Sequence, residues 1–400
     1  MDKTVKIKQS FEKKYRQGYP LLTEEALVSS GKLHEEGELL QVVTEDGDFI
    51  GYGYHGRQNK GVGWILTHRE HEAIDQRLFD RKLIEAVGRR SAFFLDETTT
   101  AFRVFNGEGD GIGGVTIDNY AGYYVIQWYS RGVYQFKDYI VHALQTYTDC
   151  IGIYEKKRFA KKGEYVEDND FVSGEEAPSP LIVKENGVNL AVYLNDGAMT
   201  GIFLDQREVR KMLMDHLAAD RSVLNTFSYT GAFSVFAAMG GASGTTSVDV
   251  ANRSLEKTSE QFRVNHLPVE SQKIIVDDVF VYYKRATKRE EEYDVVVVDP
   301  PSFARTKKTT FSAAKDYAKL LKETIALTRT GGTIVASTNH AGLSRKKFRS
   351  FIDQAFDEAG HTYRIVEQFR LPEDFVTLEE FPEGNYLKVY VIEKLKAKEA

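Results

Sequence analysis

The spacing of hydrophobic and polar positions changes along the chain and predicts regions of different architecture. Residues 1 to about 70 contain short hydrophobic runs separated by polar turns and interrupted by glycine. Such short, closely spaced strands are typical of a small β-barrel, and helical periodicity follows through Glu70–Ala86. We therefore expect a barrel domain over residues 1–70. Its predicted strands are Glu38–Val43, Phe49–Tyr54 and Gly63–Thr67.

Residues 71–194 have the pattern of a mixed α+β domain. Strands and hairpins surround one predicted helix near Tyr134–Tyr147, and the turns Gly107–Gly111 and Asn119–Gly122 separate the first strands. Gly174–Pro180 is the stretch most typical of a linker, although Leu181–Val192 still has the pattern of a hairpin. We expect a middle domain over residues 71–194.

From about residue 195, helical segments alternate with buried hydrophobic strands, which is the pattern of a doubly wound parallel sheet. Two late runs, Thr362–Phe369 and Tyr386–Glu393, lie close together and favour an antiparallel strand inserted at one edge. The predicted fold class is α/β, with a Rossmann-like sheet over residues 195–400. The other predicted strands are Ser222–Asn225, Gly244–Asp249, Gln272–Val276, Tyr293–Asp299 and Gly332–Ser337.

Composition limits the class of protein. The chain has 400 residues, of which 42% are hydrophobic, enough for two or three domains of ~100–200 residues each. No run approaches the ~18 apolar residues of a membrane span, and Met1–Lys8 lacks the apolar core of a signal peptide. The single cysteine, Cys150, excludes an intrachain disulfide and a multi-cysteine metal site. We expect a cytoplasmic protein with no membrane partner and no metal.

The net charge of −6 argues against a general polyanion binder, so a role with nucleic acid requires local basic patches. A basic cluster alone is more often a solvated surface. The cluster of Arg305, Lys307 and Lys308 differs because it follows Phe303 directly, where cations would hold the phosphates that flank a base stacked on that ring. The other clusters are Arg81-Lys82 with Arg89-Arg90, Lys156–Arg158 with Lys161-Lys162, and Arg345–Lys347 with Arg349.

The segment Tyr293–Phe303 carries the most information about function. Its valine run predicts a strand buried on both faces of a parallel sheet, and ligands of such sheets bind beyond the carboxyl ends of the strands. Pro300 and Pro301 stiffen the loop and leave backbone carbonyls free to accept hydrogen bonds. A carboxylate from Asp299, free carbonyls and an aromatic ring suit a nucleobase flipped out of its stack. The alternative is an ordinary Pro-Pro turn after a buried strand.

Acids at the ends of successive predicted strands indicate an adenosine cofactor without phosphates. The first strand leads into Asn225–Ser234, which lacks the Gly-x-Gly-x-x-Gly spacing of pyrophosphate sites. Asp249 follows Gly231 by 18 residues, a distance that suits hydrogen bonding to ribose hydroxyls. Asp278 is placed to accept from an adenine amino group. These features point to S-adenosylmethionine and disfavour a nicotinamide-dependent oxidoreductase.

A polar segment, Thr200–Arg207, comes just before the sheet. Its Arg207 is a candidate partner for the carboxylate of an amino acid. The alternative is a helix that Asp205 caps, with Arg207 in solvent.

Together these motifs resemble the class I S-adenosylmethionine-dependent 23S rRNA methyltransferases, whose members have a PUA barrel, a middle domain of two hairpins around a helix, and a Rossmann-like domain. The likeness covers nearly the whole chain. It implies that Phe203, Asp205 and Arg207 meet the methionine end of the cofactor, Asp249 the ribose and Asp278 the adenine. The full set of implied cofactor residues is Phe203, Asp205, Gln206, Arg207, Asn225, Phe227, Tyr229, Gly231, Asp249, Asp278, Val279 and Asp299.

One turn departs from the members of this family that make 5-methylcytosine. They carry a cysteine after the strand that follows the Asp-Pro-Pro strand, and in this chain that position falls on Asn339. Cytosine C5 is a poor nucleophile until a thiolate adds to C6. Because Asn339 has no thiolate and Cys150 lies in the middle region, methylation of cytosine C5 is not expected.

The turns Asp299–Lys307 and Ser337–His340 are instead similar to those of the related 23S rRNA guanine-N7 methyltransferases. Guanine N7 already has an in-plane lone pair and needs no covalent activation. The resemblance implies that Asp299 stabilises the cation that develops on the purine, that Phe303 stacks on the base and that Asn339 aligns its Hoogsteen edge. Basic residues near 81–90 and 156–162 would then extend the RNA track.

We therefore expect a methyltransferase that acts on guanine N7 in 23S rRNA, presented as naked RNA or as a large-subunit assembly intermediate. Three alternatives stay open. They are methylation of an exocyclic amino group, methylation of cytosine C5, and an RNA-binding or ribosome-assembly role without turnover.

Overall fold

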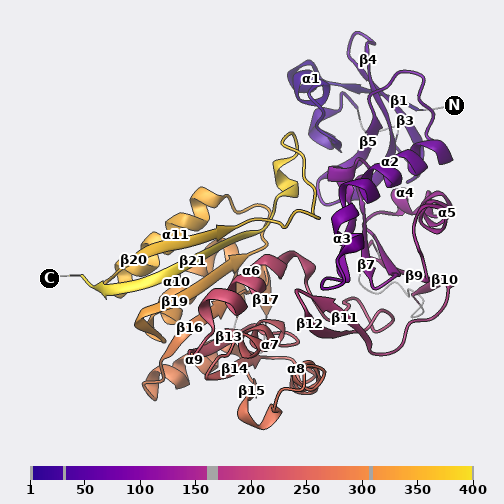
Figure 1. Cartoon of the computed structure of the whole chain (residues 1–400). Helices are drawn as coiled ribbons and strands as arrows, with labels where there is room; N and C mark the ends of the chain where they lie inside the picture. The colour runs from indigo at the N-terminus through magenta and orange to yellow at the C-terminus, as the bar shows by residue number, and fades with distance from the viewer. Residues whose placement is uncertain (1–2, 30–32, 160–169, 306–309, 399–400) are drawn as a thin grey trace. The chain divides into compact units, whose positions relative to one another are not determined.

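The computed structural model describes residues 3–29, 33–159, 170–305 and 310–398 (Figure 1). The chain forms two compact units, each built from separate stretches of sequence. The first unit contains Met1–Val183, Tyr193–Thr200 and Glu373–Gly384, and the second contains Lys184–Val192, Gly201–Pro372 and Asn385–Ala400. The predicted division at residues 70 and 194 remains a prediction. No helix in the described ranges is long and apolar enough to cross a membrane.

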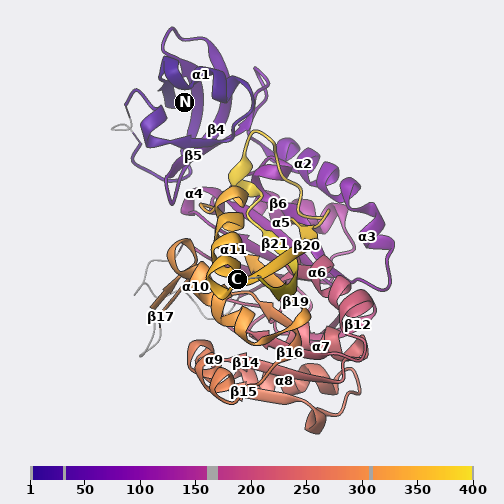
Figure 2. The ribbon, with the colours of Figure 1, turned by 90° about the vertical axis from the view of Figure 1, so that its left-hand side faces the viewer.

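The N-terminal part of the first unit is a five-stranded sheet in the order β1-β3-β4-β5-β2, with helix α1 beside it (Figure 2). The three predicted strands are confirmed as β3 (Leu39–Thr44), β4 (Phe49–Gln58) and β5 (Gly61–Thr67). The hydrophobic pattern did not reveal β1 (Lys3–Ile7), α1 (Gln9–Arg16) or β2 (Leu21–Thr23). The first two are rich in polar residues, and β2 has only three residues.

The middle part of the first unit is a second five-stranded sheet in the order β10-β9-β8-β7-β6. The helix predicted near Tyr134–Tyr147 is α5, and the predicted turn at Asn119–Gly122 joins β7 to β8 through two positive-φ residues, Ala121 and Gly122. The elements are α2 (Gln76–Arg89), α3 (Ser91–Leu95), β6 (Ala101–Asn106), β7 (Val115–Tyr120), β8 (Tyr123–Trp128), α4 (Arg131–Tyr134), α5 (Lys137–Tyr147), β9 (Gly152–Lys157) and β10 (Phe171–Gly174).

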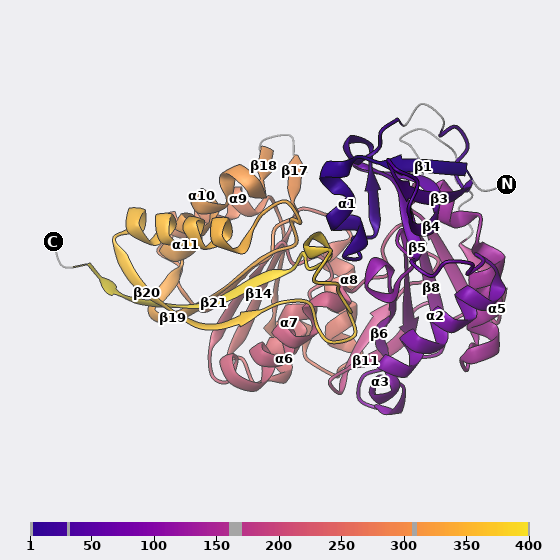
Figure 3. The ribbon, with the colours of Figure 1, turned by 90° about the horizontal axis from the view of Figure 1, so that it is seen from above.

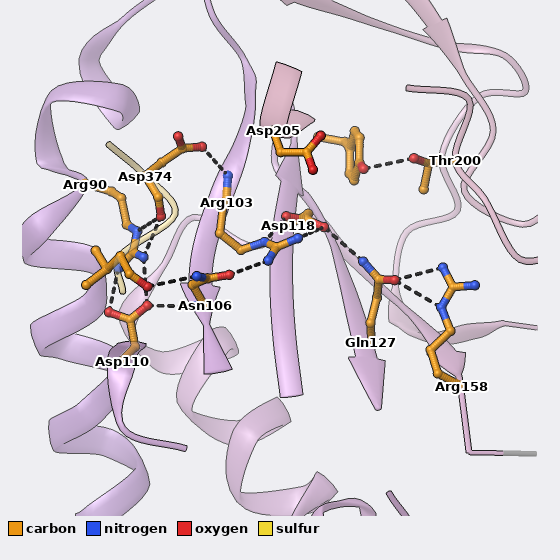
Figure 4. A network of polar contacts seen from close by, with 12 residues as sticks. Arg90, Arg103, Asn106, Asp110, Asp118, Gln127, Arg158, Thr200, Asp205 and Asp374 are labelled. Atoms are coloured by element: carbon orange, nitrogen blue, oxygen red, sulfur yellow. Dashed lines mark hydrogen bonds and ion pairs between the residues drawn. The ribbon is translucent and has the colours of Figure 1, made fainter. Parts of the chain in front are cut away.

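A buried network of charged groups runs through this middle part (Figure 4). Arg90 is fully buried and makes two hydrogen bonds to the Asp110 carboxylate, at 2.8 and 2.7 Å. In the same sheet, Arg103 pairs with Asp118. Lys156 is buried and pairs with Asp170. The expectation that the basic residues near 81–90 and 156–162 line an RNA track is therefore wrong for Arg90 and Lys156, whose charges are neutralised inside the fold. Lys161 and Lys162 lie outside the described residues.

The stretch Glu373–Gly384, which we call the C-terminal strap, belongs to the first unit although it lies between β20 and β21 in sequence. The backbone carbonyl of Asp374 accepts from the Arg90 guanidinium at 2.6 and 3.0 Å, and the Phe375 ring lies 4.3 Å from the Arg103 guanidinium carbon. Phe381 packs into the core of the N-terminal sheet against Tyr19. Gly109 has to lack a side chain, because a Cβ there would lie 1.8 Å from the carbonyl oxygen of Val376.

The second unit contains a seven-stranded sheet in the order β15-β14-β13-β16-β19-β21-β20, whose first five strands are parallel. The predicted antiparallel strand is confirmed as β21, which inserts between β19 and β20. The strands are β13 (Ser222–Thr226), β14 (Gly244–Asp249), β15 (Lys273–Val276), β16 (Tyr293–Val298), β19 (Thr328–Thr338), β20 (His361–Phe369) and β21 (Lys388–Ala397), and the predicted hairpin is β11 (Leu181–Glu185) with β12 (Val188–Val192).

Helices cover both faces of this sheet, with α10 and α11 on one side and α6 and α7 on the other (Figure 3). Val295 and Val297 face the side of α6 and α7, whereas Val296 and Val298 face the side of α9, α10 and α11. Burial on both faces explains the unbroken valine run. The helices are α6 (Arg207–Met212), α7 (Ala232–Met239), α8 (Ser254–Arg263), α9 (Val279–Lys288), α10 (Ala313–Ala326) and α11 (Arg345–Ala359).

Candidate active site

The pocket of the second unit lies at the carboxyl ends of the parallel strands, as the fold predicts. It encloses about 310 Å³. The loops that follow β13, β14, β15, β16 and β19 all contribute to its wall. The lining residues are Ile202, Phe203, Asp205, Gln206, Arg210, Asn225, Phe227, Ser228, Tyr229, Thr230, Ala232, Phe233, Asp249, Val250, Asp278, Val279, Phe280, Asp299, Pro300, Pro301, Ala304 and Asn339.

The loop between β13 and α7 has an unusual backbone. Phe227 and Tyr229 adopt positive φ angles of 56° and 53°, a region that bulky residues rarely occupy. Asp249, at the end of β14, holds this loop because its Oδ2 accepts from the backbone N–H of Tyr229 at 2.8 Å. Such strained positions cluster at ligand sites, where surrounding contacts hold them in place. The strain therefore marks this loop as the part of the wall built for binding.

Asp249 and Asp278, which were predicted to contact the ribose and the adenine, both line the pocket. The second carboxylate oxygen of Asp249 accepts from the N–H of Ala251 at 2.9 Å, and Asp278 caps α9 by accepting from the N–H of Phe280 at 2.9 Å. Each carboxylate oxygen has a further lone pair. Backbone N–H groups therefore fix both acids in the wall of the pocket they line.

Asp299 lies at the end of β16 and is partly accessible from the pocket. Its carboxylate accepts from Gln206 Nε2 at 3.1 Å, and the same nitrogen donates to Ser337 Oγ at 2.7 Å. Burial, with a smaller contribution from the nearby Asp205 carboxylate, raises the pKa of Asp299 to about 6. Hydrogen bonds from Ser337 and Gln206 oppose that rise in pKa. Asp299 is therefore mostly ionised at neutral pH.

The Gln206 amide has one fixed orientation, because its nitrogen donates to Asp299 and to Ser337. Its Oε1 is buried and has no hydrogen-bond partner in the part of the chain that the structure describes. A buried acceptor left unpaired costs ~1–3 kcal/mol, so a ligand donor would stabilise it. Together with Asp205 and Asp299, this oxygen makes the polar wall rich in acceptors. Such a wall suits a cofactor with an ammonium and a sulfonium, as S-adenosylmethionine has, and not a phosphorylated one.

Two predicted cofactor residues do not line the pocket. Arg207 is buried at the start of α6 and pairs with Glu208, and Gly231 forms the N-terminal cap of α7 with a φ of 79°. A Cβ at Gly231 would lie 2.4 Å from the Thr258 side chain, so its role is to let the loop turn. The arginine on the wall is instead Arg210. It makes two hydrogen bonds of 2.7 Å to Glu185 and one of 2.8 Å to the carbonyl of Phe203.

The predicted target side of the site is formed by the loops after β16 and β19. Phe303 is 62% exposed at the start of a short hairpin of β17 (Phe303–Arg305) and β18 (Thr310–Ser312), which the sequence did not reveal. Arg305 is exposed on the same strand, and Lys307 and Lys308 lie outside the described residues. Ser302 Oγ donates to Asn339 Oδ1 at 2.9 Å. That bond directs the Asn339 amide so that its Nδ2 is available as a donor.

Ten of the twelve predicted cofactor residues line one pocket, together with Asn339. Arg210 was missed because the sequence favoured Arg207, one helical turn earlier, and because its partner Glu185 is distant in sequence. Ser337 and Tyr386 were missed for a different reason. A single serine or tyrosine at a strand end has no distinctive pattern.

Comparisons with known proteins agree with this site. A family model described as an S-adenosylmethionine-dependent methyltransferase matches residues 156–384, and a model of a PUA-like domain matches residues 5–68. YwbD of Bacillus subtilis, named as a candidate ribosomal RNA large subunit methyltransferase, is 57% identical over 394 residues, covering 98% of this chain and 100% of YwbD. Ribosomal RNA large subunit methyltransferase I of Alteromonas mediterranea is 31% identical, covering 98% and 99%.

Solved structures show the same likeness. SMU.776, described as a candidate methyltransferase complexed with SAH, matches with a TM-score of 0.91 and 39% identity, covering 98% of this chain and 100% of that one. A candidate S-adenosylmethionine-dependent methyltransferase from Streptococcus mutans matches with a TM-score of 0.89 and 38% identity, over the same shares of the two chains.

Proposed function

The chain belongs to the S-adenosylmethionine-dependent methyltransferases, and from that premise we propose that it methylates N7 of a guanine in 23S rRNA. The names of its relatives support large-subunit ribosomal RNA as the substrate. The PUA-like match over residues 5–68 agrees with an RNA substrate. Naked 23S rRNA or a large-subunit assembly intermediate would present the target base.

The observation that carries the choice of base is the side chain at position 339. No cysteine lines the pocket, whereas Asn339 does, and the resemblance aligns Asn339 with the cysteine of the members that make 5-methylcytosine. The single cysteine, Cys150, belongs to the first unit, and burial raises the pKa of its thiol to about 11. That thiol is protonated at neutral pH and is a poor nucleophile. A base that attacks with its own lone pair fits this pocket, whereas cytosine C5 does not.

The cofactor supplies a methyl group on a sulfonium, and the N7 lone pair forms the new bond as the sulfur–carbon bond breaks. No proton leaves the base, so the site needs no general base. The ionised Asp299 stabilises the positive charge that appears on the purine. Asn339 Nδ2 donates toward O6, and Phe303 stacks on the ring. Positioning of this kind is worth ~7–11 kcal/mol when the geometry is held well.

Ribosomal RNA from wild-type and deletion cells tests the proposal. Borohydride reduction and aniline treatment cleave RNA at 7-methylguanine, so reverse transcription should stop at one 23S position in the wild type alone. Purified enzyme with S-adenosylmethionine should restore the stop on RNA from the deletion strain. A covalent adduct between the enzyme and RNA containing 5-fluorocytosine would overturn the proposal, as would 5-methylcytosine in nucleoside mass spectra.

An exocyclic amino group is the second candidate, because Pro300 and Pro301 line the pocket beside Asp299. Carbonyls of that loop would accept the hydrogens of an amino group. Nucleoside mass spectrometry separates N7 from N2 and N6 products. An assembly factor without turnover predicts that no radiolabel passes from S-adenosylmethionine to RNA.

A further inference from the structure

Strand β21 begins at the edge of the sheet where ligands bind. It runs antiparallel to β19, and its first residue, Lys388, pairs with Thr338, the last residue of β19. The parallel strands end at this edge, so β21 is the strand whose beginning lies there. Side chains near its start can therefore contact residues that form or support the wall of the pocket.

Tyr386 lies two residues before β21 and contacts the cofactor side of the pocket. Its hydroxyl donates to Asp205 Oδ2 at 2.9 Å, and Asp205 lines the pocket. The neighbouring Leu387 is fully buried in the core beneath α6 and α7, which fixes the backbone here. A donor from a rigid segment holds the Asp205 carboxylate in one orientation.

Lys388 contacts the turn that follows β19. It is 3% exposed, and its Nζ donates to the carbonyl oxygen of His340 at 2.9 Å. His340 directly follows Asn339. Burial lowers the pKa of Lys388 to about 8, and the nearby Arg345 contributes to that lowering. The ammonium is thus retained at neutral pH and fixes the backbone of the turn that carries Asn339.

We propose that Tyr386 and Lys388 are positioning residues, with Tyr386 orienting Asp205 toward the cofactor and Lys388 holding Asn339 toward the target base. The short segment Tyr386–Lys388 then orients a residue of each predicted half of the site. The role of Lys388 rests on the proposed function, whereas that of Tyr386 needs only cofactor binding. The two roles predict losses in different quantities, which are cofactor affinity for Tyr386 and turnover for Lys388.

Calorimetry with S-adenosylhomocysteine tests Tyr386 without RNA. Tyr386→Phe should weaken affinity about tenfold, because a hydrogen bond that orients a charged group is lost. In an Asp205→Ala background the same change should have little further effect, since coupled residues are not additive. The matched control is Tyr363→Phe, which removes a tyrosine–carboxylate bond to Asp353. Tyr363 lies near the start of β20, at the end of the sheet away from the pocket, so this variant should leave affinity unchanged. Additive losses, or a Tyr386→Phe affinity equal to wild type, overturn the role of Tyr386.

Methyl transfer tests Lys388. Lys388→Met should lower kcat for tritium transfer to RNA about tenfold and leave S-adenosylhomocysteine affinity within about twofold. Lys394→Met is the control, because Lys394 is also buried on β21 and donates to the backbone carbonyls of Ile325 and Thr328. The Lys394→Met variant should have nearly the same kcat per folded molecule as wild type. In an Asn339→Ala background, Lys388→Met should cause little further loss of kcat. An additive loss of kcat in the double variant overturns the role of Lys388. Equal losses of kcat in Lys388→Met and Lys394→Met overturn it as well. If wild type does not modify guanine at all, the proposed function fails and the Tyr386 result still stands.

Discussion

The Gln206→Leu variant tests whether Asp299 acts as a carboxylate whose charge the protein maintains. Leucine fills a similar space but removes the donor to Asp299 and to Ser337. A hydrogen bond to a charged group is worth ~1.5–3 kcal/mol, and one pKa unit corresponds to about 1.36 kcal/mol. Starting from about 6, the pKa of Asp299 should rise to ~7–8. At pH 7 the ionised fraction should then fall from roughly nine-tenths to between about a half and a tenth.

The assay is the pH dependence of kcat for methyl transfer at saturating S-adenosylmethionine. Saturation separates turnover from any loss of cofactor affinity caused by removing Gln206 Oε1. Wild type should lose activity as the pH falls through about 6, because Asp299 becomes protonated. In Gln206→Leu the same loss should occur ~1–2 units higher, and activity should recover at alkaline pH.

The matched control is Gln261→Leu, which removes another buried amide of the second unit. Its bonds go to the backbone of Ala191 and not to the pocket. This variant should keep the wild-type pH profile. An unshifted acid limb in Gln206→Leu would refute the reasoning, as would a uniform loss of rate at every pH.

Three further variants test other parts of the molecule. Asp299→Asn should lower transfer ~10²–10³-fold with S-adenosylhomocysteine affinity nearly intact. In wild type the unfolding free energy should fall as the pH rises from ~4 to about 6, because only the folded state keeps the Asp299 proton there. Asp299→Asn should remove this fall in stability. Unimpaired transfer by the variant would exclude a catalytic role. Phe303→Ala should raise the KM for RNA, since stacking is worth ~1–3 kcal/mol per base, and an unchanged KM would contradict stacking. Arg90→Ala should lower the unfolding free energy by ~3–5 kcal/mol in urea titrations, because the buried Asp110 carboxylate would lose both of its bonds from that guanidinium. Among the residues that the structure describes, only Arg89 and the N–H of Asn106 would still donate to it. A change below about 1 kcal/mol would contradict this reasoning.

The sequence predicted the second unit well because its strands are long and hydrophobic. The valine run of β16 can be buried only between two layers of helices, and the acids that follow successive parallel strands must meet at one edge. Asp249, Asp278 and Asp299 could therefore be predicted to lie together, whereas most of the other predicted cofactor residues came from the resemblance to a known family.

The remaining features depend on contacts between residues distant in sequence. Arg210 lines the pocket in place of Arg207 because Glu185, on the preceding hairpin, fixes its guanidinium. Arg90 belongs to a basic cluster of the kind usually found on a surface. It is buried because Asp110 and the carbonyl of Asp374 accept hydrogen bonds from its guanidinium. Charge patterns along a chain do not reveal such partners, and this explains why the predicted RNA track failed at Arg90 and Lys156.

The C-terminal strap has a consequence for how the protein is made. Phe375 and Phe381 complete the first unit, yet they are encoded after almost the whole of the second. During synthesis, the core of the N-terminal sheet is thus completed only when the strap, which ends at residue 384 of 400, has been made. A nascent chain arrested earlier would expose Tyr19 and leave Arg90 without the carbonyl of Asp374. Domains commonly fold in order from the N-terminus, but in this chain the first unit is completed only after most of the second unit has been synthesised.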